Sequence, residues 1–396
     1  MMHPLRGLGL AVSLLLASTL AAAPNARAQS TPSTAAYVYI QIQGAEGAVY
    51  GFSVSSTAQL NAISGSPFKP AGQIAGSTPT KFFTAGKDLL HSYGIGANGV
   101  IEPQLAQMPV FEYGGSVCGS SANGQNGAVL DHSGKYIFVL MENGNPQIAN
   151  CSAYQTYEIE NDGAFLFAGD IAYAGGGDWS LVSILGNEKY AYYTNVPLQT
   201  DSAEAFQRDA SGALQGMTQF SWSTPTLNGG WYDVFAPDAS PTGNYLVLQL
   251  YPYYVNHTDL PQLASYTVDD KGSISTTNTS SNMPTSALYI PGSSVTPGST
   301  FSPAGNLYAL YADNGVGNAA SGIEIYNFNG AAPLALYKTL LTDTPIGQVA
   351  WDSSNHLYAI SQSTNTLYVF TVTPASVTED TSISIGSPYK MIVVSE

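Results

Sequence analysis

The residues best suited to bind a small polar ligand are grouped in one stretch, residues 251–259. It carries aromatic rings beside amide, imidazole and carboxylate groups: Tyr251, Tyr253, Tyr254, Asn256, His257 and Asp259. Rings of this kind cover the apolar face of a sugar, and short polar side chains meet its hydroxyls. Trp222 and Trp231 could line the same surface. The pattern favours an uncharged ligand, although the tyrosines could instead pack the loop against the fold.

A second set of residues could do acid–base chemistry or hold a hard cation. Glu142, Asp178 and Asp313 lie near the expected ends of strands, and His257 is the best-placed histidine. Carboxylates that converge act as general bases or bind calcium, whereas carboxylates on a solvated surface do neither. Spacing leaves both interpretations open, so these four residues are catalytic candidates only, and no motif supports a calcium ion.

Familiar cofactor and nucleophile motifs are missing from the sequence. No two histidines share a metal-ligand spacing, so no zinc centre is expected. The chain has no nucleophile elbow, no phosphate-binding loop and no dinucleotide fingerprint, so we expect no cofactor. Function must therefore rest on a site without a recognisable signature.

The N-terminal segment predicts export. Residues 1–6 are basic, residues 7–23 are apolar, and Ala26-Arg27-Ala28 is a small-x-small cleavage site, so residues 1–28 resemble a secretory signal peptide. Residues 29–34 would form a short flexible N-terminus. No later apolar run approaches the roughly 18 residues that a membrane helix needs. We therefore expect a periplasmic or extracellular protein without membrane insertion.

The net charge limits the classes of partner that the protein can bind, and the cysteine content predicts a disulfide. The formal net charge is −16, and only Arg208 remains among the arginines once residues 1–28 are removed. Nucleic acid is excluded as a partner because it requires clustered basic residues. The candidate partners that remain are a carbohydrate, a neutral lactone and a cell-surface protein. We expect the protein itself to be a monomer. Cys118 and Cys151 are predicted to form a disulfide, which is the default for two cysteines in an exported chain.

Seven copies of one short phrase divide the chain into similar units. In the clearest copy, residues 263–274, a strand ends near an aromatic residue and a polar turn leads into a second strand. The aromatic residues that align the copies are Phe52, Tyr93, Tyr157, Phe206, Tyr266, Tyr326 and Phe370. Four copies keep a glycine where the turn needs a positive φ, at Gly99, Gly163, Gly212 and Gly272. A strand-forming repeat every 41 to 64 residues predicts an all-β, seven-bladed propeller.

A second repeated element, a strand, a tight turn and another strand, lies between these phrases and gives each unit four antiparallel strands. Residues 35–43 match the second strand of a unit, and residues 389–396 match a first strand. The C-terminal strand should therefore complete the first blade and close the ring, so residues 35–396 form one domain. Residues 81–90 supply less strand than their counterparts, which leaves the strand boundaries of the second blade open.

Three stretches carry a resemblance to a known family: AVYGFSVSSTAQLNAISGSPF at 48–68, TSISIGSPY at 381–389, and the turn at Ser133–Val139. They resemble the bacterial seven-bladed lactonase-like propellers, which include phosphogluconolactonase-like and YVTN-repeat proteins. The resemblance implies the fold and a hydrolase that opens a sugar lactone. The branch that acts on a phosphorylated lactone usually carries a His-rich segment. Here the matching stretch has His132 alone, which disfavours that substrate.

Strand order indicates where a site should lie. The connections 110–126, 142–152, 220–232, 251–262 and 279–298 are long and would all emerge on one end of the ring, which we call the long-loop face. The turns on the opposite, tight-turn face are short. Asp131, Asp238 and Asp352 head such turns and are predicted to cap their own backbone. Because long loops on a rigid scaffold usually bind ligands, the long-loop face is the predicted site.

Overall fold

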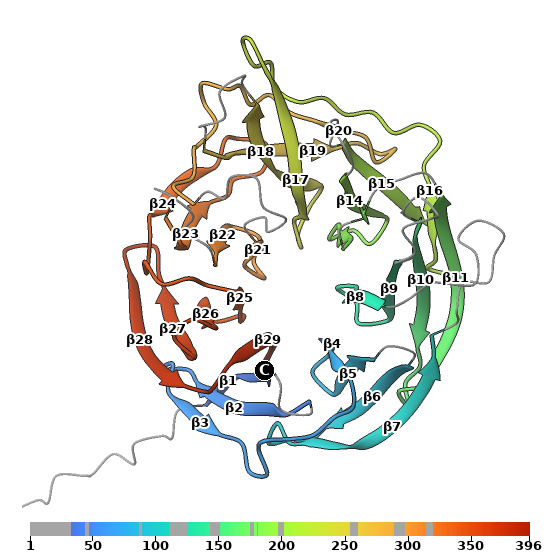
Figure 1. The fold of residues 1–396 in the computed structure, drawn as a ribbon, viewed down its shortest axis with the longest axis vertical. Coiled ribbons are helices and arrows are strands. Elements are labelled where there is room, and N and C mark those ends of the chain that lie inside the picture. The colour runs from blue at the N-terminus through green and yellow to red at the C-terminus, as the bar shows by residue number, and fades with distance from the viewer. Residues whose placement is uncertain are drawn as a thin grey trace, which may run out of the picture. The chain divides into compact units, whose positions relative to one another are not determined.

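The architecture was analysed in a computed structural model. It describes residues 33–43, 47–86, 89–110, 125–142, 151–174, 178–179, 181–196, 202–253, 260–288, 298–313 and 320–396. All regular structure in these residues is β-strand, arranged as seven antiparallel sheets round a central channel (Figure 1). No described segment is a helix that could cross a bilayer. The predicted seven-bladed propeller is confirmed.

Each blade is given with its innermost strand first. Blade 1 contains β29 (Pro388–Ser395), β1 (Thr34–Ile42), β2 (Val49–Ser55) and β3 (Leu60–Ala62). Blade 2 contains β4 (Gln73–Ser77), β5 (Lys81–Ala85), β6 (Leu89–Ile95) and β7 (Ile101–Pro109). Blade 3 contains β8 (Gln125–Leu130), β9 (Tyr136–Glu142), β10 (Cys151–Ile159) and β11 (Phe165–Ala174). Blade 4 contains β12 (Asp178–Trp179) and β13 (Ser183–Ile184), followed by β14 (Tyr190–Val196), β15 (Ser202–Arg208) and β16 (Leu214–Gly216).

The last three blades follow the same plan. Blade 5 contains β17 (Trp231–Ala239), β18 (Tyr245–Tyr253), β19 (Gln262–Val268) and β20 (Ile274–Ser275). Blade 6 contains β21 (Gly298–Phe301), β22 (Leu307–Ala312), β23 (Gly322–Asn327) and β24 (Ala335–Lys338). Blade 7 contains β25 (Gln348–Trp351), β26 (His356–Ser361), β27 (Thr366–Val372) and β28 (Val377–Ser384). Blade 4 differs from the others because two short strands, β12 and β13, both pair with β14.

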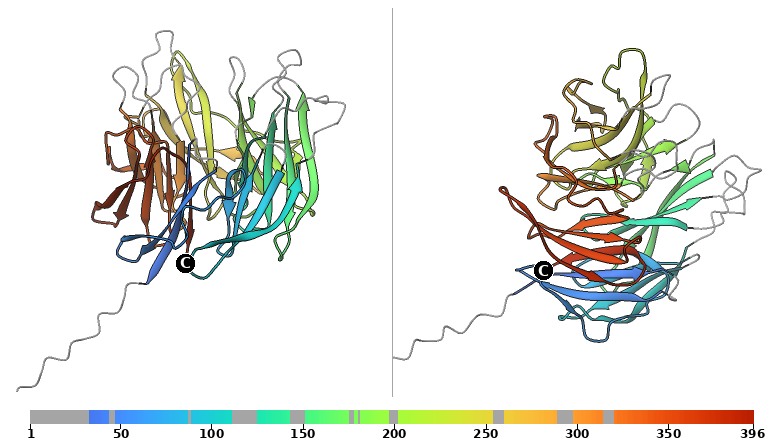
Figure 2. Two further views of the ribbon diagram at one scale, coloured as in Figure 1. Left: turned by 60° about the horizontal axis from the view of Figure 1, so that its bottom comes forward. Right: turned by 60° about the vertical axis from the view of Figure 1, so that its left-hand side comes forward.

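The ring closes as predicted. Strand β29 pairs antiparallel with β1, with Tyr37 opposite Val394 and Ile40 opposite Met391. The C-terminal end therefore lies beside the first strands of the chain (Figures 1 and 2). Residues 81–90, which supply little strand, hold all of β5 and the start of β6, and β4 completes a regular second blade.

The core lies between neighbouring blades. A middle strand such as β26 is buried along its whole length because each of its faces packs against another blade. The largest fully buried side chains are mainly tyrosines, among them Tyr39, Tyr192 and Tyr266. Two of these hydroxyls bond to a hairpin turn of the next blade, since Tyr39 donates to the Gly99 carbonyl at 2.7 Å and Tyr192 to the Gly272 carbonyl at 2.8 Å. Tyr266 donates instead to the Ser223 carbonyl at 3.1 Å. Satisfied hydroxyls let these large rings fill the space between blades without an unpaired polar group.

The glycine that recurs in the hairpin turns is also explained by packing between neighbouring blades. Gly99 and Gly272 have φ of +73° and +82°, where a side chain is disfavoured. A Cβ at Gly272 would lie 2.7 Å from the ring of Tyr190 in the preceding blade, and one at Gly99 would collide with Tyr37. A Cβ at Gly212 would likewise collide with Tyr136, whereas at Gly163 the neighbours are Leu105 and Ser92. In three of the four hairpins the glycine therefore places a turn against a tyrosine of the preceding blade.

Candidate functional site

The strand connectivity separates long and short connections as predicted. The strand ends that flank the connections β9–β10, β18–β19, β16–β17 and β20–β21 lie at one end of the ring, and turns such as those after β8 and β25 lie at the other. Residues Tyr254, Asn256, His257, Asp259 and Cys118 lie outside the described residues, so the aromatic loop and the disulfide remain predictions. Cys151 begins β10, which fixes its backbone only.

Four of the predicted ligand-binding residues lie in described segments: Trp222, Trp231, Tyr251 and Tyr253. Trp231 starts β17 directly opposite Tyr253 of β18. Its ring is 52% exposed, and its Nε1 donates to Asp233 at 3.0 Å. Tyr251 instead packs edge-to-face against Phe235, with ring centroids 4.9 Å apart. Trp222 packs against the core between blades 4 and 5. The structure therefore places Trp231 at the surface, while Tyr251 and Trp222 anchor neighbouring segments.

The acidic candidates are distributed among different blades. Glu142 ends β9, Asp178 begins β12, and Asp313 is an exposed residue after β22. The side chains of the first two are not among those described, so their convergence stays a prediction. Among the described residues, no three His, Cys, Asp or Glu side chains gather closely enough to share a metal ion.

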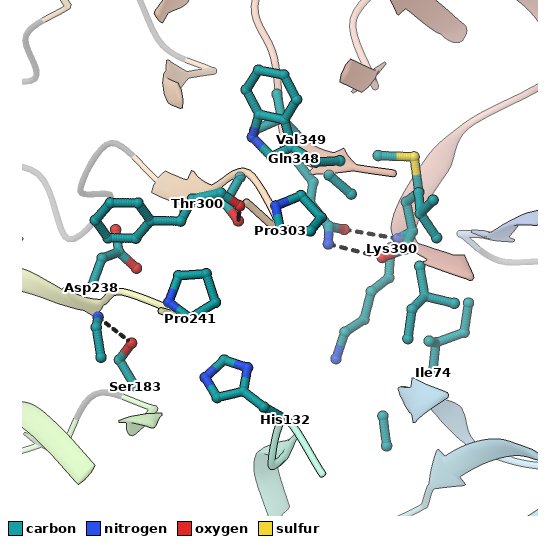
Figure 3. Close-up of a pocket in the computed structure, with 18 residues that line it drawn as sticks. Ile74, His132, Ser183, Asp238, Pro241, Thr300, Pro303, Gln348, Val349 and Lys390 are labelled. Carbon is teal, nitrogen blue, oxygen red and sulfur yellow. Dashed lines mark hydrogen bonds between the residues drawn. The ribbon is translucent and has the colours of Figure 1, made fainter. Parts of the chain in front are cut away.

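A cavity of about 720 Å³ occupies the central channel. Its walls come from the innermost strands of six blades and from short turns at the tight-turn face (Figure 3). The polar side chains that line it are His132, Ser183, Asp238, Thr300, Gln348 and Lys390. A concave space of this volume, with a few polar groups among apolar ones, suits a small molecule. The cavity reaches turn residues such as Pro241 and Pro303. It therefore lies toward the tight-turn face and not at the predicted long-loop face.

Asp238 is not a turn cap, so the sequence-based assignment of this residue was wrong. A register shift between Phe235 and Asp238 moves the carboxylate into β17, and the turn is capped instead by Ser240, whose Oγ donates to the Thr242 carbonyl at 2.6 Å. Asp131 and Asp352 do cap their turns as predicted, each through Oδ1 accepting backbone N–H groups at 2.8 to 3.0 Å. The register shift therefore places Asp238 on the channel wall, whereas Asp131 and Asp352 remain in their turns.

Neighbouring hydroxyls of blade 6 hold the Asp238 carboxyl. Its Oδ2 accepts a hydrogen bond from Tyr308 Oη at 2.9 Å and another from Ser299 Oγ. Burial raises the pKa of Asp238 to about 6, and the two hydroxyl hydrogen bonds only partly oppose that rise. A carboxyl with such a pKa exchanges protons close to neutral pH, which is the property of a general acid or base.

Lys390 supplies the positive charge of the channel. It lies on the closing strand β29, and Figure 3 shows its side chain extending into the cavity. The strand is fixed to blade 7 by Gln348, which donates to the Met391 carbonyl at 2.9 Å and accepts from the Met391 N–H at 2.8 Å. Burial lowers the pKa of the Lys390 ammonium below its ordinary value. Sequence analysis did not single out Lys390, because an isolated lysine in a terminal strand has no motif.

His132 reaches the channel from the turn after β8. Its Nε2 lies 2.7 Å from the carbonyl of Ile184, which can only accept a hydrogen bond. Nε2 therefore carries a proton and donates it to this carbonyl. The turn itself is held by Arg208, which pairs with Asp131 at 3.1 Å and with Glu188 at 2.5 Å. This arginine is 7% exposed and so belongs to the junction of blades 3 and 4.

Comparisons with known proteins agree with this architecture. A scan against protein-family models finds no match, and neither does a search of curated proteins. Among solved structures, a putative 6-phosphogluconolactonase from Bacteroides fragilis superposes with a TM-score of 0.63 at 15% identity, covering 92% of this chain and all of the other. The chain has the lactonase-like propeller fold.

Two further structures support that assignment of the fold. The periplasmic gluconolactonase of Pseudomonas aeruginosa gives a TM-score of 0.63 at 13% identity, over 91% of this chain and 99% of that one. A putative 6-phosphogluconolactonase from Bacteroides uniformis gives 0.64 at 14% identity, over 91% of this chain and all of that one. At such low identity the likeness concerns the lactonase-like fold alone, and the chemistry must be argued from the channel residues.

Proposed function

We propose that this lactonase-like propeller binds a neutral sugar lactone in its central channel and opens it by hydrolysis, with Asp238 as the general base. The observation that carries the proposal is the Asp238 carboxyl, which lines a cavity of about 720 Å³ and has a pKa of about 6. The gluconolactonase of similar fold supports the choice of substrate class.

The proposed reaction requires only water and the lactone. Asp238 removes a proton from a water molecule, whose oxygen attacks the lactone carbonyl and forms a tetrahedral oxyanion. Collapse of this intermediate breaks the bond between the carbonyl carbon and the ring oxygen. The ring oxygen takes the proton back from Asp238 and becomes a hydroxyl, and the product is a hydroxy acid. Ionised Asp238 is the active form, so the rate should rise as pH passes through about 6.

A phosphorylated lactone fits this channel less well. Phosphate groups are held best by a bidentate guanidinium, and the described side chains that line the cavity include no arginine. Arg208 is engaged between Asp131 and Glu188 at the blade 3–blade 4 junction. An uncharged substrate also avoids repulsion by a chain with a formal net charge of −16.

The test is acid release from a panel of neutral aldonolactones, followed in a pH-stat above the spontaneous rate. Asp238→Asn should lower kcat/KM by 10² to 10⁴-fold, the usual contribution of a general base. Asp380→Asn, on the exposed strand β28, makes the same chemical change away from the channel and should keep full activity. A wild-type rate equal to the spontaneous one contradicts the proposed activity, and an active Asp238→Asn variant contradicts the assigned base.

We also propose that the protein is exported and that its long-loop face binds a second, larger ligand. The basic, apolar and small-x-small segments of residues 1–28 support secretion, and they would leave Cys118 and Cys151 in an oxidising compartment. On the long-loop face, the 52% exposed ring of Trp231 favours a second candidate function, the binding of a glycan or a cell-surface protein. Loss of glycan retention in Trp231→Ala, at an unchanged melting temperature, is the result expected for that candidate.

A further inference from the structure

The ammonium of Lys390 lines the channel but forms no salt bridge with any described residue. Among the side chains that line the cavity, Lys390 carries the ammonium and Asp238 carries the carboxyl. The salt bridges among described residues join Lys135 to Glu158, Arg208 to Asp131 and Glu188, and His356 to Asp352, so none of them includes Lys390. Asp238 lies across the cavity from Lys390 (Figure 3). Its Oδ2 accepts hydrogen bonds from Ser299 and Tyr308. Among the described residues, the ammonium therefore faces the cavity without a carboxylate in salt-bridge contact.

An ammonium in this position is costly unless an anion accompanies it. Removing a charge from water is unfavourable, and a nearby opposite charge recovers part of that free energy. Burial lowers the pKa of Lys390, and no charge among the described residues acts against that effect. The side chain also points into open space and away from its own strand (Figure 3). An anion that enters the channel would meet this ammonium directly.

We propose that Lys390 is the binding site for one carboxylate group, carried by a small hydroxy acid in the central channel. The inference deepens the proposed function, on which the choice of hydroxy acid rests. The hydroxyls of such an acid would face the polar lining side chains Thr300 and Ser183, and its carboxylate would pair with the ammonium.

A carboxylate fits the site better than a phosphate does. One ammonium balances one negative charge, and the lining residues that the structure describes offer no second lysine and no arginine for a dianion. The net charge of −16 opposes entry of any anion and opposes a dianion about twice as strongly. The site should therefore select monocarboxylates over both phosphates and neutral polyols.

The carboxylate has two chemical sources, which the experiment separates. Ring opening of a neutral lactone creates a carboxylate inside the channel, so Lys390 would retain the product. Alternatively, the lactone itself carries a carboxylate, so Lys390 would select the substrate. In the first case gluconate inhibits hydrolysis of a neutral lactone competitively, and Lys390→Met weakens this inhibition. In the second case a lactone with a carboxylate substituent has a higher kcat/KM than its neutral analogue, and Lys390→Met removes the preference.

Binding is measured first by calorimetry at pH 7.5 with gluconate, glucitol and inorganic phosphate as probes. Wild-type protein should bind gluconate at least tenfold more tightly than glucitol or phosphate. Lys390→Met should lose that margin, and Lys390→Arg should keep most of it because the charge remains. Lys338→Met, an exposed change on β24, is the matched control and should bind as wild type does. Circular dichroism and melting temperature establish that each variant is folded.

Two results would overturn the inference. One is equal binding of gluconate by wild type and folded Lys390→Met, and the other is equal binding of glucitol and gluconate by wild type. The outcome is independent of catalysis. A protein that binds gluconate through Lys390 but opens no lactone would retain the carboxylate site and lose the proposed activity. A lactonase that ignores gluconate would do the reverse.

Discussion

Replacing Asp238 by asparagine should make the protein more stable and less active. Asparagine keeps an acceptor oxygen for the hydroxyls of Tyr308 and Ser299 but carries no charge. The Asp238 pKa rises from 3.8 to about 6 on folding, and each pKa unit corresponds to about 1.4 kcal/mol. The ionised carboxyl therefore costs about 3 kcal/mol of folding free energy, which Asp238→Asn should recover at neutral pH.

The gain should depend on pH in a defined direction. Below pH 3.8 the carboxyl is protonated in both states and the two proteins should differ little. Between pH 3.8 and about 6 the unfolded chain ionises while folded Asp238 keeps its proton, so wild-type stability falls relative to the variant. Above pH 6 the folded carboxyl ionises too, and the difference levels off. A general base that destabilises its own fold is a known compromise between stability and activity.

The measurement is the melting temperature of both proteins from pH 3.5 to 8. With an unfolding entropy of about 2.1 cal/mol/K per residue, 3 kcal/mol corresponds to about 4 °C for a propeller of this size. Asp380→Asn, which removes the same charge from the exposed strand β28, should stay within about 0.5 kcal/mol of wild type at every pH. A melting temperature of Asp238→Asn equal to or below that of wild type at pH 7.5 would refute the reasoning about burial.

Two further predictions concern the ring. Deleting residues 389–396 removes most of β29 and exposes the inner edge of β1, so we expect a broad, less cooperative melting curve at a lower temperature; an unchanged transition would show that closure contributes nothing. Arg208→Met leaves the buried Asp131 carboxylate without its cation and should cost about 3 to 5 kcal/mol, measured by urea unfolding against the exposed Lys271→Met as control. An Arg208→Met protein as stable as wild type would contradict the assignment of this ion pair to the blade junction.

The fold could be read from the sequence because its determinants are local and repeated. A hairpin glycine such as Gly272 needs a positive φ, and this requirement recurs in four units. In three of them the glycine also sits against a tyrosine of the preceding blade. The match of residues 35–43 and 389–396 to two strands of one blade is likewise a pattern within short segments. Neither inference required knowledge of which residues meet across the channel.

The channel site could not be read in the same way. Its walls are built from short segments of different blades, from Ile74 in β4 to Val393 in β29, and no spacing along the sequence relates these segments. Asp238 was interpreted by analogy with Asp131, but the register shift in β17 places it two residues before the turn-capping position. The sequence instead drew attention to residues 251–259, where unusual side chains are adjacent along the chain.

The seam between β1 and β29 affects biosynthesis. A ribosome makes β29 after all the other strands, and this strand brings the channel lysine and also covers the inner edge of the first blade. A nascent polypeptide in which six blades are already complete would still lack the innermost strand of blade 1 and the Lys390 ammonium of the channel. Maturation of the ring and acquisition of its ligand-binding charge would thus be a single late event.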